Sequence, residues 1–194
     1  MKRLIIISIS LFVITTLYAQ IPNPEIASLH QEQQKLQQNG MLVLGSWAVG
    51  NFLIGGMGMA RNQGINHYFH QMNVFWNTVN LGIAVAGYLG ATQEPAIDNI
   101  LAPLNQAQGF SKALMINTGL DVAYVMTGLF LRERSANVSK YQARLKGYGN
   151  SLILQGSFLF LFDLALLFMN EQILGDMINL AGNNLALSAN GIRF

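Results

Sequence analysis

Two aspartates of this sequence lie inside long apolar stretches, where a charge costs free energy. Asp163 interrupts the run LFLFDLALLF, and Asp121 lies in the middle of a second apolar stretch. Ionisable residues inside membrane segments serve as proton or ion sites, and a protonated carboxyl group can also donate a hydrogen bond to a neighbouring helix. Because no Lys or Arg lies in the interior of these stretches, we expect at least one of the two carboxyl groups to be protonated.

Amide side chains occupy similar depths in the apolar stretches. At about 100° per residue, Asn77 and Asn80 share one face of a helix. A rise of about 1.5 Å per residue places four polar side chains near one level: Asn51, Asn80, Asp121 and, a few ångströms further out, Asp163. We therefore predict a polar core layer, a candidate ion or ligand site, made of Asn51, Asn77, Asn80, Asn117, Asp121, Gln155 and Asp163. The same residues would also serve as hydrogen-bonded glue between helices.

The elements that must position these residues are membrane helices. Charged residues make up 10% of the 194 residues, against roughly 25% in soluble domains. Four apolar segments follow one another: Met41–Ala60, Met72–Ala91, Lys112–Leu131 and Ser151–Met169. About 20 apolar residues cross a bilayer as a helix, and the chain lacks the alternating pattern of membrane strands. The sequence thus predicts an all-α membrane protein, with an antiparallel four-helix transmembrane bundle over residues 41–170.

Both ends of the chain carry additional segments. Residues 1–19 have the basic start, apolar run and small final residue of a secretory signal peptide, with an uncleaved anchor helix as the alternative. Residues 20–40 are polar and predict a short external helix that leads into the first span. Residues 171–194 carry apolar residues at helical spacing, which predicts an amphipathic helix on the outer surface. The final LSANGIRF also resembles the last strand of an outer-membrane barrel, although the rest of the chain has no barrel pattern.

The distribution of charge predicts the orientation. The links 61–71 and 132–150 hold six Lys and Arg residues and one acid, Glu133. Since an excess of Lys and Arg marks the cytoplasmic side, both links are expected there and both termini in the periplasm. We therefore expect a multi-pass protein of the cell envelope, in the inner membrane.

Other kinds of site find less support. His67 and His70 share a helix face, which suits a metal, but no third ligand lies near them and aromatic neighbours favour an interfacial anchor. The chain has no Cys and no phosphate-binding loop. Without Lys2 and Arg3 of the signal peptide, nine basic residues balance nine acidic ones, which argues against binding to nucleic acid. We expect no cofactor and no enzymatic activity.

Three stretches together resemble a known family. They are NGMLVLGSWAVGNFLIGG (39–56), YFHQMNVFWNTVNLGIA (68–84) and RLKGYGNSLILQGSFLFLFDLALLFMN (144–170). They resemble uncharacterised, signal-bearing integral membrane proteins from Bacteroidota. The resemblance implies no activity, but it implies an envelope location and a family pattern that includes the Trp47–Asn51, Trp76–Asn80 and Gln155–Asp163 clusters.

Three functions remain open on the sequence. The first is a non-enzymatic structural or accessory subunit, embedded in the lipid bilayer and assembled with copies of itself or with another membrane protein. Small residues on a helix face, such as Gly82, Ala86 and Gly90, favour such contacts. The second is a proton- or ion-coupled carrier or channel unit that uses Asp121 and Asp163. The third is a membrane enzyme with a metal at His67 and His70.

Overall fold

The fold is seen in a computed structural model that describes residues 24–92 and 101–189. Four long helices make up nearly all of these residues: α2 (Pro24–Arg61), α3 (Gly64–Thr92), α4 (Leu101–Ser135) and α5 (Gln142–Ala189), with the short 3-10 helix η1 (Ser139–Tyr141) before α5. The described ranges contain no strand, so the all-α prediction is confirmed. The predicted signal peptide, 1–19, lies outside the described residues.

All four helices are long and apolar enough to cross a membrane. Large apolar side chains cover the outside of the bundle; Ile54, Leu161 and Phe168 are each more than 60% exposed. A continuous apolar surface of this kind would promote aggregation of a soluble protein, but lipid solvates it. The helices therefore indicate a multi-pass membrane protein, as the sequence predicted.

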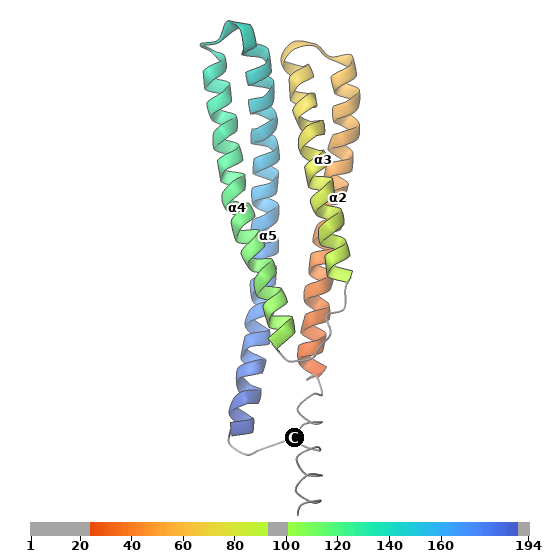
Figure 1. The fold of residues 1–194 in the computed structure, drawn as a ribbon, viewed down its shortest axis with the longest axis vertical. Coiled ribbons are helices and arrows are strands. Elements are labelled where there is room, and N and C mark those ends of the chain that lie inside the picture. The colour runs from red at the N-terminus through yellow and green to blue at the C-terminus, as the bar shows by residue number, and fades with distance from the viewer. Residues whose placement is uncertain (1–23, 93–100, 190–194) are drawn as a thin grey trace, which may run out of the picture.

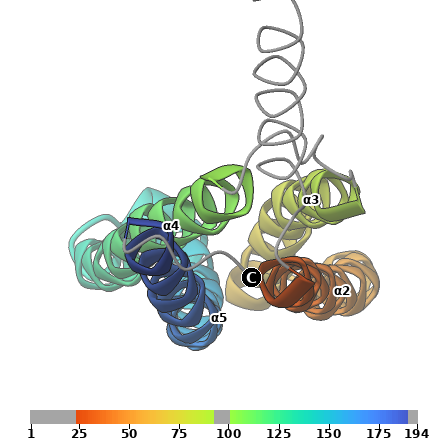
Figure 2. The same ribbon diagram turned by 90° about the horizontal axis from the view of Figure 1, so that it is seen from below.

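The helices form two antiparallel hairpins that lie side by side (Figure 1). Helix α2 pairs with α3, α4 pairs with α5, and α5 contacts all three other helices. Figure 2 shows the two hairpins end-on. We call the end that carries the links 62–63 and 136–141 the turn end. At the opposite end three helices project as what we call the three-helix tip, made of residues 24–40, 101–111 and 170–183.

A left-handed glycine makes the first hairpin tight. Gly64 begins α3 with φ +60, a conformation that glycine adopts without steric cost. Asn62 closes the end of α2, because its backbone N–H (3.0 Å) and its side-chain amide (2.8 Å) both donate to the carbonyl oxygen of Gly58. Only two residues then join the helices, so α2 and α3 must run antiparallel.

The buried faces follow a repeat of three and four residues. On α3 the buried residues are Asn73, Asn77, Asn80, Ala84 and Ala91. On α4 they include Leu104, Ala107, Ser111, Leu114, Asp121, Gly128 and Ser135. This spacing averages 3.5 residues, the period of helices that pack side chains into one another's gaps as coiled coils do. Polar residues therefore occupy positions where a soluble bundle would carry leucine.

Glycines allow the backbones to touch near the turn end. A Cβ atom on Gly128 of α4 would lie 2.7 Å from the carbonyl oxygen of Gly149 on α5. A Cβ atom on Gly147 would lie 2.5 Å from the carbonyl oxygen of Ile65 on α3. Close approach at small residues is a main source of helix association in lipid. Near the turn end, these contacts fix α5 against α3 and α4.

The three-helix tip differs from the sequence prediction. Residues 24–40 are helical, as predicted, and continue without a break into the first span as α2, whereas residues 171–189 continue α5 instead of forming a helix of their own. The predicted apolar face of the tail exists, but it packs against helices. Its residues join one apolar cluster: Ile26, Leu104, Ala107, Ile173, Leu174, Met177 and Ala181. Residues 190–194, the end of the LSANGIRF tail, lie outside the described residues.

Candidate functional site

A hydrogen-bonded cluster centred on Gln155 joins three helices. The indole Nε1–H of Trp47 donates to Gln155 Oε1 (3.0 Å), and Gln155 Nε2 donates to Asn73 Oδ1 (3.1 Å) and Asn51 Oδ1 (3.4 Å). The Ser151 hydroxyl also donates to Asn73 Oδ1, at 2.5 Å. Gln155 and Ser151 are fully buried. We call this set the Gln155 cluster; it ties α5 to the α2–α3 hairpin.

Aromatic packing and a second pair of amides extend the Gln155 cluster. The Trp47 ring stacks on Phe158 of α5, with ring centroids 3.8 Å apart and planes 8° from parallel. On α3 the Asn77 amide donates to the carbonyl oxygen of Asn73 (2.8 Å), and the Asn80 amide donates to Asn77 Oδ1 (3.4 Å). Both amides are buried, and their hydrogen bonds remain within one helix.

The two intramembrane aspartates meet inside the second hairpin. Asp121 of α4 is 2% exposed and Asp163 of α5 is 6% exposed. Their carboxyl groups lie within hydrogen-bonding reach of each other, and such a bond forms when one of the two carries a proton. The other oxygen of Asp121, Oδ2, is buried without a hydrogen-bond partner. No Lys or Arg is among the buried residues that the structure describes.

Leucines separate the aspartate pair from the amides along α5. Leu159 lies buried between Gln155 and Asp163, and Leu166 lies buried on the other side of Asp163. Eight residues of helix separate Gln155 from Asp163, which is about 12 Å at 1.5 Å per residue. The structure thus distributes the predicted polar residues over two levels. Asn51 lies in the Gln155 cluster, one level away from the aspartates.

A third polar cluster, which sequence reasoning missed, lies in the three-helix tip. Gln33 Nε2 of α2 donates to Asn170 Oδ1 of α5 (3.3 Å). Asn170 Nδ2 donates to the Ser111 hydroxyl (2.8 Å) and to the carbonyl oxygen of Ala107 (2.9 Å), both on α4. Gln33 and Asn170 are fully buried. The spacing of three and four residues along 26–44 would have placed Gln33 on the inner face of α2.

A comparison with known protein families shows which family the chain belongs to. A model of the family of unknown function DUF6992 matches residues 43–164, more than half of the chain. The chain belongs to this family. The DUF6992 match contains the Gln155 cluster and both aspartates, whereas Gln33 and Asn170 lie outside the matched residues. No curated protein and no solved structure matches the chain.

The remaining predicted residues of this DUF6992 chain have other surroundings. Asn117 is half-buried on α4 and takes part in none of the three clusters. His67 donates from Nδ1 to the carbonyl oxygen of Met59 (2.9 Å), and the His70 ring lies where a Cβ atom of Gly58 would be. Both histidines therefore pack α3 against α2. Across residues 24–92 and 101–189, no three His, Asp or Glu residues lie together as a metal site would need.

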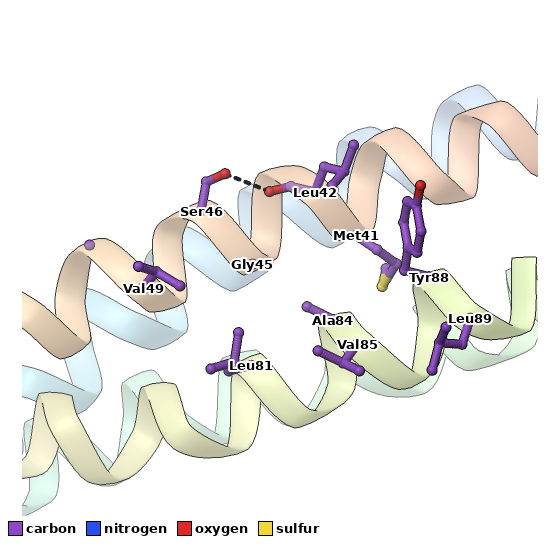
Figure 3. A pocket seen from close by; sticks show the side chains of 11 residues that line it. Met41, Leu42, Gly45, Ser46, Val49, Leu81, Ala84, Val85, Tyr88 and Leu89 are labelled. Carbon is purple, nitrogen blue, oxygen red and sulfur yellow. Dashed lines mark hydrogen bonds between the residues drawn. The ribbon is translucent and has the colours of Figure 1, made fainter.

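An apolar groove lies on the outer face of the α2–α3 hairpin of the DUF6992 chain (Figure 3). Its volume is about 660 Å³, and it is lined by Met41, Leu42, Gly45, Ser46, Val49, Gly50, Leu81, Ala84, Val85, Tyr88 and Leu89. The Ser46 hydroxyl donates to the carbonyl oxygen of Leu42 (2.7 Å) and so is satisfied within its own helix. Sites for polar ligands hold several converging polar groups. The groove is instead a hydrocarbon surface.

Proposed function

We propose that this DUF6992 chain is a non-enzymatic multi-pass protein of the cell envelope that acts as a structural or accessory subunit. The observation that carries the proposal is the Gln155 cluster, in which one side chain binds Trp47, Asn51 and Asn73 across three helices. In lipid, apolar contact alone does not drive helices together, so packing and hydrogen bonds must do so. The amide of Gln155 makes such bonds between helices, and so does the amide of Asn170 in the three-helix tip.

The structural proposal has a direct test. A strain that lacks the chromosomal gene is supplied with wild-type protein, with Gln155→Met or with Asp163→Asn, and its resistance to detergent is measured beside the amount of folded protein. If the chain is a structural subunit, the detergent resistance of each strain should rise and fall with its amount of folded protein. Asp163→Asn, which keeps a hydrogen bond to Asp121, should then preserve resistance. Loss of resistance at a normal amount of folded Asp163→Asn would contradict the structural role.

A second candidate function rests on the contact between Asp121 and Asp163. Two carboxyl groups that share a proton, with no buried cation among the described residues to compensate them, form a site that can take up and release protons. We propose proton-coupled transport as the alternative to a structural role. Its test is acidification of proteoliposomes under an imposed potential: transport predicts proton flux in the wild type and none in Asp163→Asn.

The location we propose is the inner membrane, with both termini in the periplasm. Six exposed basic residues gather at the turn end: Arg61, Arg132, Arg134, Lys140, Arg144 and Lys146. The three-helix tip carries the exposed acids Glu25, Glu32, Glu171 and Asp176. Since basic residues are retained in the cytoplasm, this separation of charge supports a cytoplasmic turn end.

The partner we propose is another membrane helix, from a second copy of the chain or from a different subunit. On α3, Gly82, Ala86 and Gly90 are exposed in a row, and a Cβ atom on either glycine would meet open space. Small residues four apart allow a neighbouring helix to approach closely. Because the chain has no Cys, Ala86→Cys offers a single cross-linking position. A disulfide-linked dimer in native membranes would indicate a second copy, and a cross-link of different mass would indicate another subunit.

A further inference from the structure

His30 lies in the three-helix tip, outside the predicted membrane span. It is eleven residues before Met41 on α2, which is about 16 Å at 1.5 Å per residue. It is nevertheless only 4% exposed. A histidine outside the predicted span is expected close to the aqueous phase, yet His30 is shielded from water.

Along α2, His30 lies between an apolar cluster and a polar cluster of the three-helix tip. Ile26, one turn away, belongs to the apolar cluster that α2 shares with α4 and α5. On the other side of His30, Gln33 binds Asn170 and so begins the third polar cluster. Neither ring nitrogen of His30 has a hydrogen-bond partner, and Gln33 Oε1 also lacks one. An imidazolium ion, which must donate from both nitrogens, therefore fits this site worse than neutral imidazole.

Among the described residues of the tip, no buried titratable group lies beside His30 to compensate a charge on its ring. The charged residues of its helices are Glu25, Glu32 and Lys35 on α2, Lys112 on α4, and Glu171 and Asp176 on α5, and all of them are exposed. The last turns of α3 carry only the half-buried Tyr88. Burial lowers the pKa of His30 from its ordinary value of 6.5. In the described part of the tip, no buried acid opposes this effect.

We propose that His30 is a pH-sensitive latch, and that protonation of its ring releases α2 from α4 and α5 in the three-helix tip. The closed tip requires neutral imidazole, whereas the open tip exposes the ring to water and binds a proton at the ordinary pKa. The closed form is therefore fully stable above about pH 6.5 and loses stability as the pH falls below it. Each pH unit below that value favours opening by up to about tenfold, until the closed form also takes up the proton.

The latch changes the distance between two helices, which spin labels can measure. Because the chain has no Cys, labels are introduced at the exposed positions Gln31 on α2 and Gln172 on α5. Distances are recorded by electron paramagnetic resonance on the purified full chain at about pH 8 and about pH 5, either side of the ordinary histidine pKa. We expect one short distance at the higher pH and an additional longer population at the lower pH.

Two variants and a second label pair make the result specific. His30→Phe fills the same space without a titratable group, so it should keep the short distance at both pH values. His67→Phe, at the turn end, should leave the response intact. Labels at Gln63 and Ser139, both exposed at the turn end, should report no change with pH.

The latch has clear contrary outcomes. An unchanged wild-type distance between the two pH values would overturn it. So would a pH response that persists in His30→Phe. If His30→Phe does not fold, His30→Gln provides the same comparison, because it is also uncharged at both pH values. The measurement compares distances within the purified chain, so it is independent of the proposed structural function and of the orientation in the membrane.

Discussion

The carboxyl groups of Asp121 on α4 and Asp163 on α5 lie in hydrogen-bonding contact in the interior of the second hairpin. Asp163→Asn can still donate a hydrogen bond to Asp121, so its stability should stay within about 1 kcal/mol of the wild type. Asp163→Leu leaves Asp121 buried without a partner, which should cost about 1–3 kcal/mol. The free energy of unfolding of each variant is measured by adding a denaturing detergent to the protein in mild detergent. Equal stabilities of the Asn and Leu variants would show that the contact contributes nothing.

Gln155→Met keeps the length of the side chain but removes the hydrogen bonds to Trp47, Asn51 and Asn73. We expect a loss of about 1–3 kcal/mol, because the indole N–H of Trp47 and Oδ1 of Asn51 lose their partner and Asn73 Oδ1 keeps only the Ser151 hydroxyl. The matched control is Ser157→Ala, two residues away on the exposed face of α5. It should change the free energy of unfolding by less than about 0.5 kcal/mol. If Ser157→Ala lowers the free energy of unfolding as much as Gln155→Met does, the loss comes from any change in α5 and not from the hydrogen bonds of Gln155.

Gly128→Ala and Gly119→Ala make the same chemical change on the same helix, with opposite expected results. A Cβ atom on Gly128 would lie 2.7 Å from the carbonyl oxygen of Gly149, whereas on Gly119 it would meet open space. Gly128→Ala should lower the melting temperature, with a cost of about 1–3 kcal/mol from overpacking. Gly119→Ala should raise it, by up to about 1 kcal/mol of helix propensity. If both variants raise the melting temperature, α4 and α5 are not in backbone contact.

Single cysteines test the proposed orientation, since the natural chain has none. Ser139→Cys lies at the turn end and Glu32→Cys in the three-helix tip, and both positions are exposed. With a cytoplasmic turn end, a membrane-impermeant maleimide should label Glu32→Cys in spheroplasts, and Ser139→Cys only after the membrane is opened. The reverse pattern would invert the topology.

The membrane helices could be predicted from sequence because hydropathy and helix length are local properties. Asp121 and Asp163 could also be placed on inward faces, since a carboxyl group avoids lipid. The pairing of Asn51 with Gln155 could not be predicted in this way. A projection at 100° per residue drifts by about 20° per heptad from a bundle with a 3.5-residue repeat, so levels assigned over several turns are displaced.

The three-helix tip was missed for a different reason. Gln33 lies in the polar segment 20–40, which we expected outside the bundle, and Asn170 is the last residue of the predicted bundle, directly before the predicted external tail. Their burial depends on α2, α4 and α5 all continuing past the apolar stretches, which is a tertiary property. The only local sign of this burial is that the spacing of three and four residues continues along α2 from Ile26 to Leu44.

Helix α5 runs unbroken for 48 residues from Gln142 to Ala189, about 72 Å at 1.5 Å per residue, whereas the hydrocarbon core of a bilayer is only about 30 Å thick. It contains no proline at which it could bend. Such a helix behaves as a rod. Asp163 and Met177 lie about 21 Å apart on this one continuous helix, so α5 connects the aspartate pair directly to the apolar cluster of the three-helix tip.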